Sequence, residues 1–112
     1  MRHVAEDNVT EPVLLILISL AESPRHGYAL LKDIEAMSAG RVRLSTGTLY
    51  GALRRLLENG WIERFETPDT SRDKRSYRLT AQGQRVLGIE FDRLKQLTRL
   101  AGARLRVREA AT

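Results

Sequence analysis

The stretch from Leu44 to Phe65 constrains the fold of this chain more than any other. Four leucines in it recur at i, i+4, i+7 and i+8, which places them on one face of an α-helix. They are Leu49, Leu53, Leu56 and Leu57. Ser45 precedes them, and its hydroxyl can cap the helix by accepting from an N–H of the first turn. Asn59-Gly60 ends it, because glycine suits the left-handed conformation that follows many helices. An alternating strand is then predicted from Trp61 to Phe65.

The opposite face of this predicted helix is thin and basic. At about 100° per residue it collects Gly47, Thr48, Tyr50, Gly51, Arg54, Arg55 and Glu58. A short helix with an apolar back and such a front suits the reading of a DNA major groove. A bulkier front would hold the helix away from the base edges.

Two more helices are predicted before this stretch. Residues 1–9 look like a polar arm, and Thr10-Glu11-Pro12 then begins a helix, with Thr10 as its cap and proline in the first turn. The following residues, to Leu20, are almost all apolar, so this helix is expected to be buried on most sides, although periodicity alone would also allow a strand. A second helix is predicted over 26–38 and a very short strand over 41–44. The inward stripe of the second helix is assigned to Tyr28, Leu31, Ile34 and Met37.

After Phe65, a polar loop leads to a second predicted strand, Lys74 to Leu79, so the two strands form a hairpin with a basic tip. Thr80 caps a further, long helix. The order helix, helix, short strand, helix, hairpin, long helix is that of a winged helix-turn-helix. The predicted fold class is therefore mainly α with a small β-hairpin wing, with residues 1–80 as the winged DNA-binding domain and 81–112 as a C-terminal dimerisation helix.

Composition excludes several classes of protein. The 112 residues fit one domain, or one domain with an extension, and the formal net charge of +5 favours polyanionic partners. The chain has no cysteine, so it has no disulfide, thiolate metal site or cysteine nucleophile. Its two histidines, His3 and His26, assemble no metal cluster. No arrangement of residues supports catalysis or a cofactor, and paired carboxylates such as Glu63 and Glu66 are ordinary strand charges.

The longest apolar run is too short to cross a membrane, and the first residues lack the apolar core of a signal peptide, so a cytoplasmic protein is the simplest interpretation.

The sequence resembles the PadR family of transcriptional regulators between about residues 10 and 87. The resemblance is carried by His26-Gly27-Tyr28, by Ser45-Thr46-Gly47-Thr48-Leu49-Tyr50 with Leu53-x-x-Leu56, by Gly60-Trp61-Ile62, and by Arg75-Ser76-Tyr77-Arg78-Leu79-Thr80-x-x-Gly83. Gly51 stands where the family pattern usually has proline. The short tail is similar to the branch that dimerises through one C-terminal helix, but it lacks the tryptophan of the multidrug-sensing members. The resemblance implies a homodimeric repressor on a near-palindromic operator in double-stranded DNA, with a possible small-molecule effector at the dimer interface.

Each candidate site residue has a functional and a structural interpretation. The predicted DNA contacts are Ser45, Thr46, Gly47, Thr48, Tyr50, Arg54, Lys74 and Arg75. The first turn of the helix can hold a phosphate or face bases, but its residues can also serve only as a cap. Arg54 can donate two hydrogen bonds to a guanine or bind a phosphate, or it can remain solvated. Tyr28 and Trp61 are expected in the core.

The long C-terminal helix carries an apolar stripe that the winged core does not need. The predicted dimerisation residues are Leu87, Phe91, Leu94, Leu97 and Ala101. The alternative is a helix that folds back on its own domain. Two rival functions stay open: a winged-helix module that binds another protein, against which the basic hairpin tip argues, and an enzyme of unrecognised type.

Overall fold

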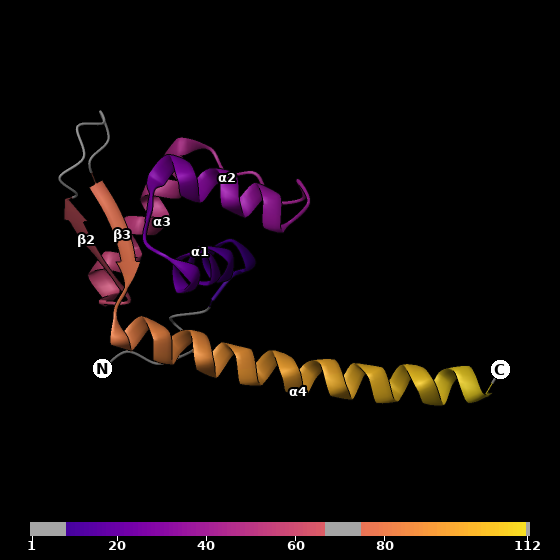
Figure 1. Ribbon diagram of the computed structural model, residues 1–112. Helices are drawn as coiled ribbons and strands as arrows, with labels where there is room; N and C mark the ends of the chain where they lie inside the picture. The colour runs from indigo at the N-terminus through magenta and orange to yellow at the C-terminus, as the bar shows by residue number, and fades with distance from the viewer. Residues whose placement is uncertain (1–8, 67–74, 112) are drawn as a thin grey trace.

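Three short helices pack with a small sheet, and one long helix projects from them. The computed structural model describes residues 9–66 and 75–111, with side chains described up to residue 108. Along the chain the elements are α1 (Glu11–Glu22), β1 (Arg25–His26), α2 (Gly27–Met37), α3 (Thr46–Asn59), β2 (Ile62–Glu66), β3 (Arg75–Leu79) and α4 (Ala81–Ala111). In Figure 1, α4 runs along one side of the body and far beyond it. The predicted mainly α fold with a β wing is confirmed.

The predicted caps set the ends of the helices. The Thr10 hydroxyl accepts from the Val13 N–H at 3.4 Å and starts α1 as predicted. The Ser45 hydroxyl accepts from the Thr48 N–H at 3.1 Å and starts α3. Gly60 follows α3 in the left-handed conformation, with φ 78°. These ends confirm the helix predicted between Ser45 and Gly60.

One apolar core lies between the three shorter helices and the sheet. Three of the four predicted α3 leucines are fully buried and Leu57 is half-buried. Ile16, Leu17 and Leu20 meet them from α1, whereas Ile18 is 39% exposed, so α1 is buried on its core face and less enclosed than expected. Trp61 is also buried, which confirms its predicted place in the core.

The sheet has the strand order β1-β3-β2 and is antiparallel throughout. Its main pair, β2 with β3, runs from Ile62 opposite Leu79 to Glu66 opposite Arg75 and matches the predicted hairpin to within one residue at each end. The hairpin tip, including the predicted contact Lys74, lies outside the described residues.

The third strand is not where the sequence analysis placed it. Residues 41–44 form no strand; the short strand is Arg25–His26, which pairs with the outer edge of β3. Residues 41–44 instead continue a turn held by Ser38, whose side-chain oxygen accepts from the Val42 N–H at 2.9 Å. The prediction failed because local alternation cannot tell which segment will reach a free sheet edge.

The inward face of α2 also differs from the prediction. Gly27, Leu30 and Ile34 are buried, whereas Tyr28 is 68% and Met37 39% exposed. Ile34 is buried as predicted and Leu31 packs half-buried against the core, so the inward face departs from the predicted stripe at Tyr28 and Met37 only. Gly27 points inward because its missing side chain leaves room for the end of Tyr50, which comes from α3 and lies against it. The prediction of Tyr28 as a core residue was therefore wrong.

The base of α4 is fastened to the turn that joins α3 to β2. The Thr80 hydroxyl accepts from the Gly83 N–H at 3.0 Å and donates to the Gly60 carbonyl at 2.6 Å.

The 31 residues of α4 span about 46 Å at 1.5 Å per residue, and the molecule is 62 Å long. Among the described residues, no helix is both long and apolar enough to cross a membrane.

Candidate nucleic-acid interface

The first turn of α3 is an open surface with little side-chain bulk. Ser45, Thr46, Gly47 and Thr48 are all exposed. A Cβ placed on Gly47 would meet nothing within 4 Å, so the backbone there is accessible to a ligand. The Ser45 hydroxyl is used by the cap and also donates to the Thr48 hydroxyl oxygen at 2.9 Å. The Thr48 hydroxyl keeps its own hydrogen for an outside acceptor.

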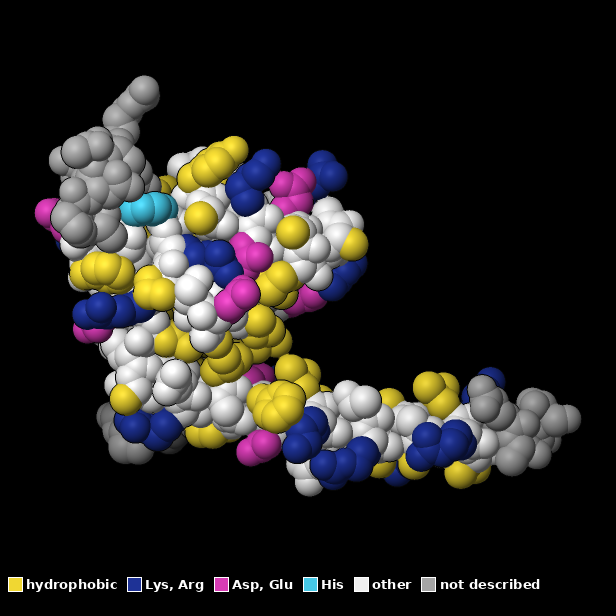
Figure 2. All heavy atoms as spheres, in the orientation of Figure 1, with side chains coloured by type: hydrophobic (Ala, Val, Ile, Leu, Met, Phe, Trp, Pro, Cys, Tyr) yellow, Lys and Arg dark blue, Asp and Glu magenta, His cyan; other side chains and the backbone are white. Residues whose placement is uncertain are grey.

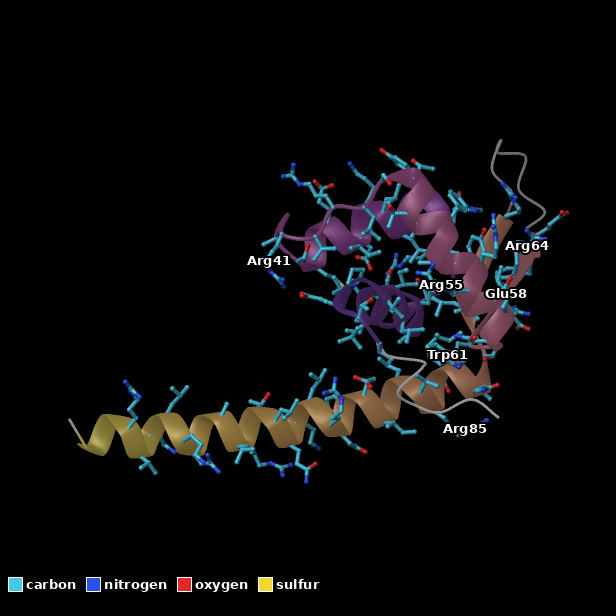
Figure 3. All side chains as sticks on the ribbon, turned by 180° about the vertical axis from the view of Figure 1, so that it is seen from behind. Arg41, Arg55, Glu58, Trp61, Arg64 and Arg85 are labelled. Atoms are coloured by element: carbon cyan, nitrogen blue, oxygen red, sulfur yellow. The ribbon has the colours of Figure 1, made fainter. Side chains whose placement is uncertain are left out.

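The next turns of α3 add positive charge to this surface. Arg54 and Arg55 are exposed, and neither has a carboxylate within ion-pair distance in the described part of the chain. Glu58 follows one turn later at the far end of the face, and Figure 3 shows Arg55 and Glu58 on α3 as seen from behind. The cations therefore lie nearer to the open first turn than the acid does.

Tyr50 has a different position from the other predicted contacts. Its side chain is half-buried at the flank of α3, and its hydroxyl end lies against Gly27 in the first turn of α2. The ring therefore packs α2 against α3, whatever else it contacts.

The wing brings further cations beside α3. Arg75 is exposed at the end of β3 nearest the hairpin tip. Arg78 lies lower on the same strand, with its guanidinium 4.4 Å from the Phe65 ring centre and 2.7 Å from a Glu63 carboxylate oxygen, so its charge is neutralised.

Arg64 is a cation of this surface that the sequence analysis did not single out. It is exposed on β2, the strand that packs against α3, and Figure 3 shows it on the same side of the molecule as Arg55 and Glu58. The strand pattern held a signal for Arg64, because it stands two residues after Ile62 and alternate residues of a strand share a face. Ile62 is buried. Arg64 therefore belongs on the α3 side of the wing.

His26 joins this surface to the wing. Its Nδ1 lies 3.1 Å from the Arg75 carbonyl oxygen and 3.1 Å from the Ser76 hydroxyl. In the described ranges, His, Asp and Glu side chains form no group of three that could hold a metal ion.

The predicted dimerisation stripe lies on a separate part of the molecule. Leu87 is half-buried, whereas Phe91, Leu94, Leu97 and Ala101 are exposed. Where α4 leaves the body, an apolar groove of about 470 Å³ opens between α1 and α4. Its lining residues are Leu14, Ile18, Ala21, Gln84, Leu87, Gly88, Phe91 and Leu94. Figure 2 shows hydrophobic side chains gathered at this corner.

Solved structures share this architecture. A PadR family transcription regulator from Clostridium difficile superimposes with a TM-score of 0.73 at 22% identity, over 86% of this chain and 99% of that one. A transcriptional regulator from Clostridium thermocellum gives 0.68 at 25% identity, over 80% and 84% of the two chains. Bacillus subtilis PadR, solved in complex with operator DNA, gives 0.61 at 23% identity, over 70% of this chain and 45% of that one.

Sequence comparison gives the family. A 37.1 kDa protein of transposon TN4556 from Streptomyces fradiae is 37% identical over 85 residues, which are 76% of this chain and 23% of that protein. This chain therefore spans about a quarter of the length of that relative. The family described as the transcriptional regulator PadR-like family matches residues 16–89, which is more than half of the chain. With the winged architecture described above, this match establishes that the chain belongs to the PadR-like family of transcriptional regulators.

Proposed function

We propose that this chain binds operator DNA as a homodimeric repressor. One observation carries the proposal: the back of α3 is buried through Leu49, Leu53 and Leu56, and its open first turn is followed by two arginines without carboxylate partners in the described residues. A helix held so firmly from behind can present its front to a major groove without losing its own packing. The relative from Bacillus subtilis that was solved with operator DNA supports the same use of the fold.

In this proposal α3 reads the base sequence, and the wing positions the protein on the DNA backbone. The N–H groups of Thr46 and Gly47 in the first turn of α3 face the phosphates or base edges, where the helix dipole favours negative charge. Arg54 reaches a guanine or a phosphate from the next turn. Lys74 and Arg75 at the wing hold the backbone or enter the minor groove. Phosphate contacts supply most of the affinity, and base contacts supply the specificity.

Dimerisation supplies the second half-site. One winged domain reads only a few base pairs, so two copies must present α3 about 34–36 Å apart on one face of the duplex. The exposed stripe of Phe91, Leu94 and Leu97 continues into the apolar groove beside α1. A second α4 seated there would cover apolar surface at about 25 cal/mol per Å². A small molecule bound in the same seam would release DNA if it favoured another spacing of the two α3 helices.

Selection of bound sequences from a pool of random duplexes tests this function directly. We expect recovery of a near-palindrome, because two symmetric copies read it. Affinity should also fall steeply with salt, since bound cations displace counterions from phosphates. A module that binds another protein would enrich no sequence and show no such dependence. Failure to enrich any motif from the pool would exclude the proposal.

A further inference from the structure

The first turn of α2 lies between the two elements proposed to touch DNA. On one side, Gly27 packs against Tyr50 of α3. On the other side, β1 pairs with β3, and the His26 ring lies 3.1 Å from the Arg75 carbonyl oxygen. Tyr28, the next residue, is therefore attached to α3 and to the wing within two residues of chain. Figure 1 shows this end of α2 beside the wing, with α4 on the opposite side of the body.

Tyr28 projects from this position into solvent. Its side chain is 68% exposed. The two residues before it are fixed, because Gly27 packs against Tyr50 and His26 pairs with β3. Its hydroxyl has no hydrogen-bond partner in the described residues. Lys32 lies one turn later on the same face, with Nζ 5.8 Å from the centre of the Tyr28 ring. The Lys32 ammonium group and the Tyr28 ring therefore share one surface that is open to solvent.

The acids of α2 do not cancel this positive charge. Asp33 faces α1 and β1, where it accepts from the Ser19 hydroxyl at 2.5 Å and lies 3.5 Å from Arg25. Glu35 pairs with Arg43 at 3.1 Å. Lys32 itself has no carboxylate within ion-pair distance among the described residues. The Tyr28–Lys32 face therefore offers donors and one net positive charge.

We propose that Tyr28 and Lys32 form a third DNA-backbone contact, in which the Tyr28 hydroxyl donates to a phosphate oxygen and Lys32 neutralises the same or the adjacent phosphate. This inference rests on the proposed DNA binding and names a further part of that interface. The helix before a reading helix crosses the DNA backbone in helix-turn-helix proteins. A phosphate contact there fixes the register of the protein without reading sequence.

Two variants and one matched control test the contact. Tyr28→Phe keeps the ring and removes the hydroxyl, and Lys32→Gln removes the charge. Lys95→Gln is the control, because Lys95 also lies over an aromatic ring, at 5.1 Å from the Phe91 ring centre, but on α4. Fluorescence anisotropy with two duplexes, a 30-bp mixed-sequence DNA and a sequence selected by the wild type from random DNA, would measure affinity from about 50 to 300 mM salt.

We expect Tyr28→Phe to weaken binding to both duplexes by the same factor, roughly tenfold for a hydrogen bond to a charged group. Lys32→Gln should make the log–log salt slope shallower by about 0.9 on both duplexes, whereas Lys95→Gln should leave it unchanged. Wild-type affinity and slope in both variants would overturn the contact while leaving the proposed function intact. A wild type that binds neither duplex at low salt would overturn both.

Discussion

At the residue scale, two glycines are required by their neighbours and not by their backbone angles. A Cβ on Gly27 would overlap the hydroxyl of Tyr50, which is the end of a side chain and can move. A Cβ on Gly83 would overlap the carbonyl oxygen of Trp61, which is backbone. That oxygen also accepts from the Thr80 N–H at 3.1 Å, so it is held in place. The second position should therefore tolerate substitution far less than the first.

Gly83→Ala should lower the free energy of unfolding by about 1–3 kcal/mol, the usual cost of overpacking a rigid site. Urea denaturation at one fixed protein concentration would measure it. Gly51→Ala is the matched control, because a Cβ there meets nothing within 4 Å in the middle of α3. The control should gain roughly 0.5–1 kcal/mol from helix propensity. Equal stability of Gly83→Ala and the wild type would contradict the tight joint between α4 and the turn that joins α3 to β2.

A second residue-scale prediction concerns acid. Glu11 lies 2.6 Å from Arg41, and this hydrogen bond, with the Coulomb attraction of the guanidinium, lowers the pKa of Glu11 below 4.5. A carboxyl whose pKa is lowered by folding stabilises the native state above its unfolded pKa and loses that contribution as pH falls through the folded value. Wild type should therefore be slightly more stable than Glu11→Gln at about pH 7 and equal to it near pH 2. Urea melts at several pH values would show this, and a gap that persists at the lowest pH would exclude the ion pair as its cause.

At the scale of elements, α3 and the wing have different tasks in the proposed interface. The front of α3 faces outward from a back that is buried in the core, so its side chains can reach base edges in a fixed geometry. The wing carries Arg75 at its distal end and a neutralised Arg78 nearer its base. Binding measurements can separate the two tasks, because base contacts and phosphate contacts respond differently to sequence and salt.

Arg54→Ala should weaken binding to the selected duplex more than to mixed-sequence DNA, by about 1–3 kcal/mol of lost discrimination. Tyr50→Phe tests the same idea for Tyr50, because it removes the hydroxyl and keeps the ring that packs near Gly27. Competition binding with the two duplexes would give both differences. Equal losses on the two DNAs would mean that these residues position the protein and do not read bases.

Replacing both Lys74 and Arg75 by alanine should instead flatten the log–log salt slope by about 1–2 units and leave the sequence preference nearly intact. Anisotropy titrations at a series of salt concentrations would measure it. An unchanged slope would show that the wing does not touch the backbone.

At the scale of the whole molecule, the net charge and the proposed DNA surface lie in different places. Residues 93–108 contain six of the 19 Lys and Arg and none of the 14 Asp and Glu. The rest of the chain thus has 13 cations and 14 anions, a net charge of −1. The positive balance of the sequence belongs to the outer half of α4, away from α3 and the wing (Figure 1). DNA binding is therefore proposed from Arg54 and Arg55 at the front of α3 and not from the total charge.

Leu94→Glu tests the proposed dimer. Leu94 lines the groove between α1 and α4, and a symmetric seam would bury two glutamates without partners. We expect a shift toward monomer in sedimentation, retained helical circular dichroism, and collapse of affinity for the selected palindrome. A wild type that sediments as a monomer at micromolar concentration, or a variant that remains a dimer, would refute this seam.

The sequence by itself determined the elements whose signals are local. A cap hydroxyl at Thr10, Ser45 and Thr80 accepts from an N–H three residues later, and leucines at helical spacing define the back of α3. Alternation likewise predicted β2 and β3 to within one residue. These features depend on neighbours along the chain, so they could be read before any fold was known.

Tertiary structure alone decided which segments and faces meet. β1 formed at Arg25–His26 because that segment reaches the free edge of β3, and residues 41–44 do not. The face of α2 that turned inward was set by the fit of Tyr50 against Gly27, which left Tyr28 in solvent. Both outcomes depend on contacts between residues more than 20 positions apart along the chain. The periodicity of α2 or of residues 41–44 cannot predict these contacts. It shows which positions are apolar, but not which distant segment will pack against them.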